Sequence, residues 1–155
     1  MNGFADAVRS RLAPSCLVDD ADSIDKGKCG ASLAEAPHPR VIVDLDETGS
    51  PLSPTNVKCD FLFFADPGLI VPIEVKDSEP NVTKATKQLQ AGAKAAEELA
   101  PSGVAVTFRA VLVSKSLRTH KRNELRGAAV KFRNQRERVR RLACGDSLTE
   151  AIGSS

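Results

Sequence analysis

Three short apolar runs follow one another in the middle of the chain: VIVDLD at 41–46, CDFLFFA at 59–65 and LIVPIEV at 69–75. The polar sequence ETGSPLSPTN separates the first two, and Asp66-Pro67-Gly68 separates the second from the third. Runs of this length between turn-forming residues predict β-strands, and the short connections predict an antiparallel three-stranded meander.

Helical periodicity flanks these strands. Residues 4–12 and 82–99 carry apolar side chains at helical spacing, which predicts an N-terminal amphipathic helix and a longer, alanine-rich helix. Asn81 is expected to cap the second helix. Pro72 removes one backbone donor from the third strand, so an irregularity or an unpaired side is expected there.

The remaining segments give weaker patterns. Residues 104–113 predict a buried strand, 119–126 a short basic helix, and 129–143 a hairpin that turns near Asn134 or Gln135. The polar run 15–39 lacks clear periodicity and is expected to be a loop, with at most a turn of helix or a short strand.

Length and composition fit one globular domain. The chain has 155 residues, 41% of them hydrophobic, with six Phe and no Trp or Tyr. A single core is therefore expected over residues 1–155. The order of predicted elements indicates an α/β (α+β) fold, in which helices flank a central mixed β-sheet.

Two acids and an amine are expected to meet at one end of this sheet. Side chains two residues apart on a strand share a face, so Glu74 and Lys76 project together. The tight turn at 66–68 brings the beginning of one strand, at Asp60, beside the end of the next. Paired carboxylates can hold Mg²⁺ or Mn²⁺, and a lysine can stabilise negative charge on a phosphate.

This arrangement resembles the PD-(D/E)xK nuclease superfamily, which has the restriction-endonuclease-like αβββαβ core. The matching residues are Cys59-Asp60 and Ile73-Glu74-Val75-Lys76, followed by a helix with Lys87-Gln88-Leu89-Gln90. The resemblance implies that Asp60 and Glu74 are metal ligands, that the Val75 carbonyl is a third, and that Lys76 is the catalytic amine. It also implies a catalytic role for Gln88, which matches a glutamine of some members.

The sequence departs from the family pattern at two places. Cys59 stands where the family has proline, and Asp6 is the nearest candidate for the acid that many members carry on the first helix. An exposed strand with a salt-bridged Glu and Lys is the alternative interpretation. Asp44 and Asp46 could form a second carboxylate pair, although an exposed strand end before a turn at Gly49 is the favoured interpretation.

Positive charge is concentrated near the C-terminus. Residues 115–141 carry eleven Lys or Arg and two acids, whereas residues 1–114 have a net charge of −5. This basic helix and hairpin extension, at about 115–143, predicts a polyanion-binding surface, with a solvated basic face as the alternative. The candidate nucleic-acid-binding residues are Lys115, Arg118, Lys121, Arg122, Lys131, Arg133, Arg136 and Arg138.

The four cysteines, at positions 16, 29, 59 and 144, form no CxxC pair. Reduced and mostly buried thiols are expected. The chain begins without a signal-peptide pattern and has no membrane-spanning apolar run, so a cytoplasmic protein without membrane contact is predicted.

These observations favour a Mg²⁺-dependent (or Mn²⁺-dependent) endonuclease, with DNA preferred over RNA. The small chain suggests a homodimer or the cleavage subunit of a larger prokaryotic defence or DNA-processing system. The alternative is a catalytically inactive scaffold of the same fold that binds nucleic acid or a partner protein through its basic segment. A plain interaction subunit would leave the basic segment unexplained.

Overall fold

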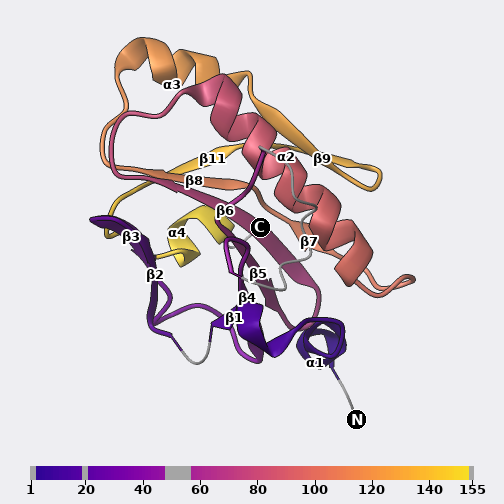
Figure 1. Ribbon diagram of the computed structural model, residues 1–155. Helices are drawn as coiled ribbons and strands as arrows, with labels where there is room; N and C mark the ends of the chain where they lie inside the picture. The colour runs from indigo at the N-terminus through magenta and orange to yellow at the C-terminus, as the bar shows by residue number, and fades with distance from the viewer. Residues whose placement is uncertain (1–2, 19–20, 48–56, 154–155) are drawn as a thin grey trace.

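The computed structural model describes residues 3–18, 21–47 and 57–153 (Figure 1). The predicted turn at Gly49 and most of the turn-rich connection before Asp60 lie outside these residues.

A seven-stranded mixed sheet forms the centre of the molecule, as the sequence predicts (Figure 1). Its strand order is β1-β4-β5-β6-β8-β11, and β7 pairs with β6 beside β8. The strands are β1 (Leu17–Val18), β4 (Arg40–Asp44), β5 (Phe61–Ala65), β6 (Leu69–Lys76), β7 (Thr107–Phe108), β8 (Val111–Ser114) and β11 (Arg140–Ala143). The expected antiparallel meander is confirmed as β4, β5 and β6, whereas β8 and β11 continue the sheet in parallel with β6.

Pro72 interrupts the pairing on one side of β6. Leu69 and Ile70 pair with β7, and Ile73 to Lys76 pair with β8 in the same register. The two intervening residues of β6 have no partner in these ladders, because proline has no N–H to donate. The predicted strand at 104–113 is accordingly divided into β7 and β8.

Helix α2 (Val82–Leu99) covers one face of the sheet. Asn81 caps it as predicted, with its Oδ1 accepting from the Lys84 N–H at 3.0 Å. The helix packs closely on the sheet, since a Cβ on Gly92 would lie only 2.9 Å from Cys59 Sγ and 3.1 Å from Pro72 Cβ. Helix α1 (Phe4–Arg9), shorter than predicted, adds Phe4 to the same core.

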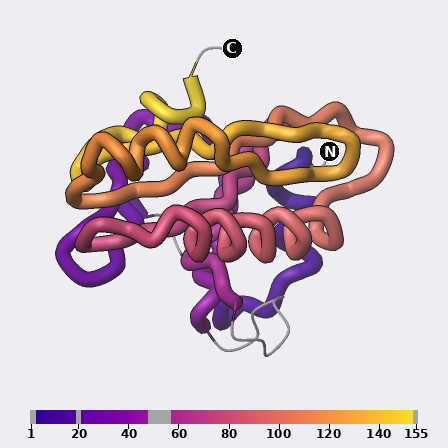
Figure 2. Tube along the Cα trace, turned by 90° about the horizontal axis from the view of Figure 1, so that it is seen from above, coloured from indigo at the N-terminus to yellow at the C-terminus, as the bar shows by residue number. Residues whose placement is uncertain are grey.

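A second apolar cluster lies on the opposite face of the sheet. Helix α4 (Thr149–Ile152) and α2 lie on opposite sides of the strands (Figure 2). The hairpin of β2 (Ser23–Lys26) and β3 (Cys29–Ser32) also belongs to this second cluster. The loop expected over 15–39 is therefore corrected: it contains a 3-10 turn, η1 (Pro14–Cys16), β1, and this hairpin. Its strands are too short to show a clear periodicity, and they are held in place by contacts with residues distant in the sequence.

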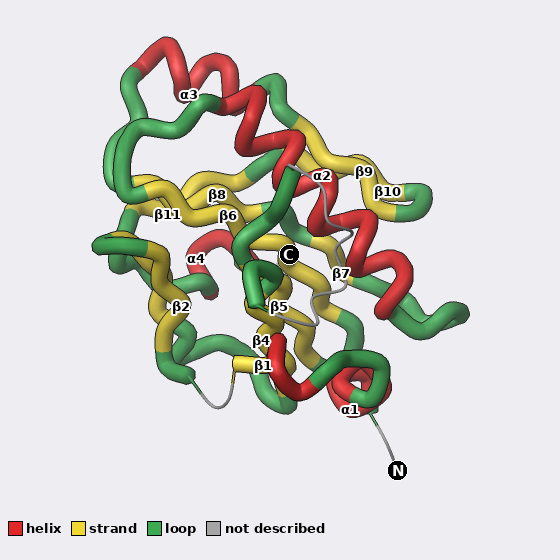
Figure 3. The backbone as a smooth tube through the Cα atoms, in the orientation of Figure 1, coloured by secondary structure: helices red, strands yellow, loops and turns green. Residues whose placement is uncertain are grey.

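The basic segment begins as predicted, with helix α3 (Thr119–Arg126), and continues as the hairpin of β9 (Ala129–Phe132) and β10 (Gln135–Arg138). The hairpin runs along α2 (Figure 3), and Gln90 of α2 exchanges two 2.9 Å hydrogen bonds with the backbone of Lys131. The chain then leaves the hairpin, because β11 joins the central sheet beside β8. The prediction of one hairpin over 129–143 is wrong beyond Arg138.

A disulfide joins Cys29 of β3 to Cys144, which directly follows β11. The expectation of four reduced thiols is wrong for this pair, and Cys16 and Cys59 are the buried free cysteines. The two bonded residues are 115 positions apart in the chain, so their proximity follows from tertiary packing alone. Among the described residues, no helix is long and apolar enough to cross a lipid bilayer.

Because this disulfide closes a loop of 115 residues, its removal is expected to destabilise the fold. We expect Cys144→Ser to lower the free energy of unfolding by about 2–5 kcal/mol, as for other native disulfides. Chemical denaturation of the oxidised protein and the variant measures this difference. The Cys16→Ser variant, which leaves the disulfide intact, should still lose stability when a reductant is added; no effect of the reductant would contradict the prediction.

Candidate active site

The pairing of β5 with β6 brings Asp60 and Glu74 together. Phe61 pairs with Ile73, which places the preceding Asp60 beside Glu74. Glu74 Oε1 accepts from the Asp60 N–H at 3.1 Å, and Asp60 Oδ2 accepts from the Val75 N–H at 2.8 Å. Each carboxylate therefore bonds the backbone of the other strand, and the two acids lie next to each other.

Lys76 completes the group. Its Nζ lies 2.9 Å from Glu74 Oε2, on the same face of β6. The Glu74 side chain is only 1% exposed, whereas that of Lys76 is 29% exposed. Glu74 is thus enclosed by the protein, whereas the Lys76 amine reaches the solvent, from which a substrate would approach.

Burial dominates the electrostatics of the acid pair. Burial and, to a smaller extent, the charge of Asp60 together raise the pKa of Glu74 to about 7, against the opposing effect of Lys76. Burial also raises the pKa of Asp60, while the hydrogen bond from Val75 N–H acts in the opposite direction. The raised pKa values show that the nearby lysines only partly offset the cost of burying two neighbouring carboxylates.

The donor set at this site suits a hard divalent cation. The two carboxylates provide oxygen ligands, and Asp60 uses one oxygen for its bond to Val75. In the described part of the chain, no group of three or more His, Cys, Asp or Glu side chains is placed to hold a metal ion. Mg²⁺ commonly binds through one or two carboxylates and keeps several waters, so Asp60 and Glu74 are the side chains here that could hold such an ion.

Gln88 projects from α2 toward the segment that precedes Asp60. Its Nε2 donates to the Lys58 carbonyl at 3.0 Å. Its Oε1 is buried and has no hydrogen-bond partner among the described residues. Gln88 thus fixes the backbone near the acid pair and leaves an acceptor there.

Cys59, which replaces the proline of the resembling family, is fully buried below α2. Its Sγ–H donates to the Ile73 carbonyl at 3.3 Å, and burial raises its pKa well above the usual value. A neutral, buried thiol of this kind is a packing residue and a poor nucleophile.

A second charged group lies at the same end of the sheet. Lys26 Nζ is 2.9 Å from Asp46 Oδ2 and 3.5 Å from Asp44 Oδ1. Asp44 is therefore partly buried and paired, and only Asp46 fits the expected exposed strand end. The charge of Lys26 also reaches Asp60, whose negative form it favours. Sequence reasoning missed Lys26, because the β2–β3 hairpin that carries it gave no clear pattern.

Asp6, the candidate for the acid that the family carries on its first helix, lies far from the acid pair. Helix α1 starts at the other end of β5, where the Ala5 N–H donates to Asp66 Oδ1 at 2.8 Å. Asp6 is exposed there, across the length of β5 from Asp60. In a meander, successive turns lie at opposite ends of the sheet. Helix α1 packs beside the turn between β5 and β6, whereas Asp60 lies at the opposite end of β5.

The predicted nucleic-acid-binding residues fall into two regions. Arg118, Lys121 and Arg122 lie at or on α3, near the acid end, and Arg118 Nε is 2.9 Å from Glu79 Oε1 in the loop after β6. The exposed Lys115 follows β8, its N–H donating to the Lys76 carbonyl at 3.2 Å.

The other four candidates belong to the β9–β10 hairpin: Lys131, Arg133, Arg136 and Arg138. Arg133 lies at its turn, where its guanidinium bonds the Ala100 and Pro101 carbonyls beyond the C-terminus of α2. This contact anchors the hairpin on the helix at the end away from Asn81. The structure therefore does not bring Arg133 together with the acid pair.

Comparisons of the chain with family models, with curated proteins and with solved structures find no match. The case for a function therefore rests on the residues and their geometry.

The raised pKa of Glu74 predicts how stability depends on pH. The unfolded chain loses the Glu74 proton near pH 4.5, whereas the folded protein keeps it until about pH 7, so stability falls as pH rises through this window. We expect the melting temperature of the metal-free protein to drop by roughly 3–10 °C more than that of Glu74→Gln between pH 4.5 and 8.

Differential scanning fluorimetry across this range measures the difference. Glu98→Gln, on α2, removes a carboxylate away from the acid pair and serves as the control. Parallel pH profiles for the parent and Glu74→Gln would contradict the assignment.

Proposed function

We propose that this protein is a metal-dependent nuclease that hydrolyses phosphodiester bonds, with DNA as the expected substrate. The observation that carries the proposal is the contact of Glu74 with both the Asp60 backbone and the Lys76 amine, at 3.1 and 2.9 Å. Phosphodiester hydrolysis requires ligands for a divalent ion and a positive charge beside the scissile phosphate. Two acids and one amine at the same strand ends supply both.

Each residue has a distinct proposed role. Asp60 and Glu74 would hold Mg²⁺ or Mn²⁺, with the Val75 carbonyl as a third oxygen ligand. When bound, such an ion lowers the pKa of a coordinated water and polarises the phosphoryl oxygen. Lys76 orients the attacking water and offsets the negative charge that grows on the phosphate. Gln88 is a positioning residue, because its bond to Lys58 holds the segment before Asp60.

The proposed setting is the cytoplasm of a prokaryote, where the protein would act as a homodimer or as the cleavage subunit of a defence or DNA-processing system. Cytosolic thiols are kept reduced, so in that compartment the Cys29–Cys144 bond would be exposed to reduction.

A second candidate function is a catalytically inactive scaffold that binds nucleic acid or a partner protein through its basic segment. The observation that favours it is the closed Lys76–Glu74 ion pair, in which the lysine already neutralises the more deeply buried acid. In a scaffold of this kind, the pair would only stabilise the end of the sheet.

Cleavage assays separate the two functions. We expect the protein to cut plasmid or linear DNA with Mg²⁺ or Mn²⁺ and to be inactive in EDTA. Asp60→Asn and Lys76→Ala should each reduce the rate by on the order of 10²–10³-fold, because each removes a metal ligand or a transition-state charge. Gel assays on duplex DNA, single-stranded DNA and RNA measure the rate and identify the substrate.

Asp25→Asn and Lys28→Ala provide matched controls at exposed positions of the β2–β3 hairpin, and both should cut like the parent. If Asp60→Asn and Lys76→Ala cut as fast as the controls, the proposed site is wrong. If the parent and all variants bind DNA and none cuts it, the scaffold function is supported.

A further inference from the structure

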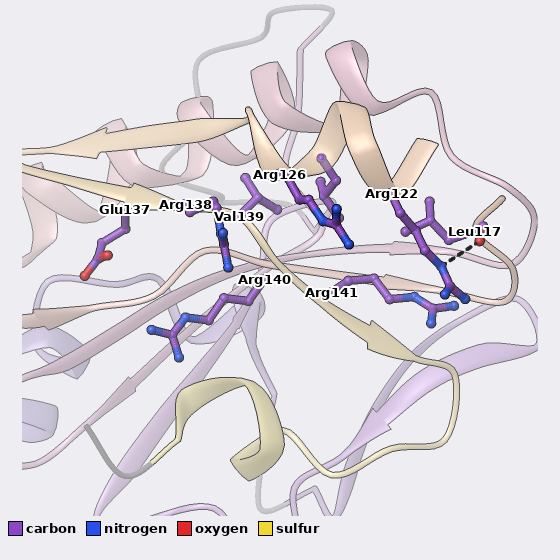
Figure 4. A pocket seen from close by; sticks show the side chains of 9 residues that line it. Leu117, Arg122, Arg126, Glu137, Arg138, Val139, Arg140 and Arg141 are labelled. Atoms are coloured by element: carbon purple, nitrogen blue, oxygen red, sulfur yellow. Dashed lines mark hydrogen bonds between the residues drawn. The ribbon is translucent and has the colours of Figure 1, made fainter. Parts of the chain in front are cut away.

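A cleft of about 690 Å³ lies between α3 and the strands β10 and β11 (Figure 4). Its apolar part is formed by Leu117, Leu125 and Val139, which are almost fully buried. Arginines line the remainder: Arg122, Arg126, Arg138, Arg140 and Arg141. We refer to this feature as the arginine cleft.

The positive charge of the arginine cleft is not balanced by the acid that lines it. Glu137 is a lining residue, but its Oε1 is already paired with Arg109 at 2.9 Å. Within residues 3–18, 21–47 and 57–153, none of the five lining arginines forms a direct ion pair with a carboxylate. Guanidinium groups gathered in a concave surface without direct ion pairs are suited to binding an anion, above all a phosphate.

Three of these arginines are held in place by the groups around them. Arg140 donates to the Ala151 carbonyl of α4 at 3.0 Å. Arg141 donates to the Ser114 hydroxyl at 3.2 Å and to the Ser114 carbonyl at 3.0 Å, while Arg122 Nε donates to the Leu117 carbonyl at 3.0 Å. The guanidinium groups of Arg141 and Arg122 come from different elements and converge at one end of the cleft (Figure 4). Burial and the charge of Arg122 lower the pKa of Arg141 against the opposing charge of Asp146, and an anion between the two arginines would relieve their mutual repulsion.

The arginine cleft is connected to the acid pair through the sheet. Lys76 of β6 pairs with Ser114 of β8, and Ser114 is also the residue that binds Arg141 of β11. Glu79, in the loop after β6, bonds both the backbone N–H and the side chain of Arg118 at the start of α3. Lys76, Ser114 and Arg141 thus follow one another across three adjacent parallel strands.

The spacing of strands gives the distance between the two sites. Neighbouring strands lie about 4.8 Å apart and residues rise about 3.3 Å along a strand, so Arg141, two strands across and two residues along from Lys76, lies roughly 12 Å away. One strand of B-form DNA advances about 3.4 Å along the helix axis per nucleotide and also winds around that axis, so this separation corresponds to about two nucleotides.

We propose that the arginine cleft binds a backbone phosphate of the nucleic-acid substrate about two nucleotides from the phosphate held at Glu74 and Lys76. This inference rests on the proposed nuclease function, because that function supplies the phosphate at Glu74 and Lys76. It assigns a binding role to Arg126 and Arg141, which sequence reasoning did not single out, and gives a discrete subsite to Arg122 and Arg138.

Binding can be measured without cleavage, by fluorescence anisotropy of a labelled duplex in EDTA. The test variant is Arg122→Gln/Arg126→Gln, because both side chains are exposed on α3. The matched control is Arg9→Gln/Arg11→Gln, which removes the same charge at exposed positions near the other end of the sheet. Thermal melting of both variants verifies that they are folded.

We expect the cleft variant to bind the duplex about tenfold or more weakly than the parent, since phosphate contacts from arginine are charge-assisted. The slope of log K against log salt should become shallower by about 0.9 for each lost phosphate contact. The control should change neither quantity by as much. Equal effects of the two double variants would overturn the proposal.

Two further arms identify the ligand and the register. Excess ATP or inorganic phosphate should displace the duplex only weakly; displacement as effective as that by unlabelled duplex would overturn the proposal in favour of a free nucleotide or phosphate ion. A single neutral methylphosphonate, placed about two nucleotides from the cut, should weaken binding by the parent and have little further effect on the cleft variant. An equal loss for the two proteins would also overturn the proposal.

Failure of this inference differs from failure of the proposed function. If the protein cuts DNA and the cleft variant binds like the control, the cleft assignment is wrong and the nuclease function stands. If nothing is cut but the cleft variant alone loses affinity in EDTA, the phosphate subsite stands and the nuclease function is wrong.

Discussion

The mutual burial of Asp60 and Glu74 is the constraint on which the candidate site depends. Two neighbouring carboxylates repel each other in a medium of low dielectric constant, and each would be costly to bury alone. They remain together because each accepts a hydrogen bond from the backbone of the opposite strand, and because Lys76 neutralises Glu74. The register of β5 with β6 therefore fixes the position of both acids.

The parallel part of the sheet extends this site sideways. Strands β6, β8 and β11 run in the same direction, so their carboxyl ends meet at one edge. In open α/β sheets, ligands commonly bind outside this edge. Lys76 at the end of β6 and Arg141 on β11 thus lie on parallel strands only two places apart in the sheet, although they are 65 positions apart in the sequence. The basic segment is therefore more than an extension, because its last part, β11, is a strand of the central sheet.

Close packing on both faces holds this edge in place. Gly92 allows α2 to approach Cys59 and Pro72 directly beneath the acid pair, and Gln88 of the same helix bonds the segment before Asp60. On the opposite face, the disulfide ties the β2–β3 hairpin to the end of β11. That hairpin carries Lys26, whose charge reaches Asp60. The electrostatics of the site therefore depend on elements from both layers.

Local patterns determined the meander, the helix capped by Asn81, and the grouping of Asp60, Glu74 and Lys76, because strand alternation and short turns fix neighbours along the chain. The family-like position of Asp6, the reduced state of Cys29 and Cys144, and the end of the basic hairpin were predicted wrongly. Each of these depends on which distant segments pack together. Only the tertiary structure placed Arg122 beside Arg141 and Lys26 near Asp60, because the periodicity of a segment does not show which distant segment it will contact.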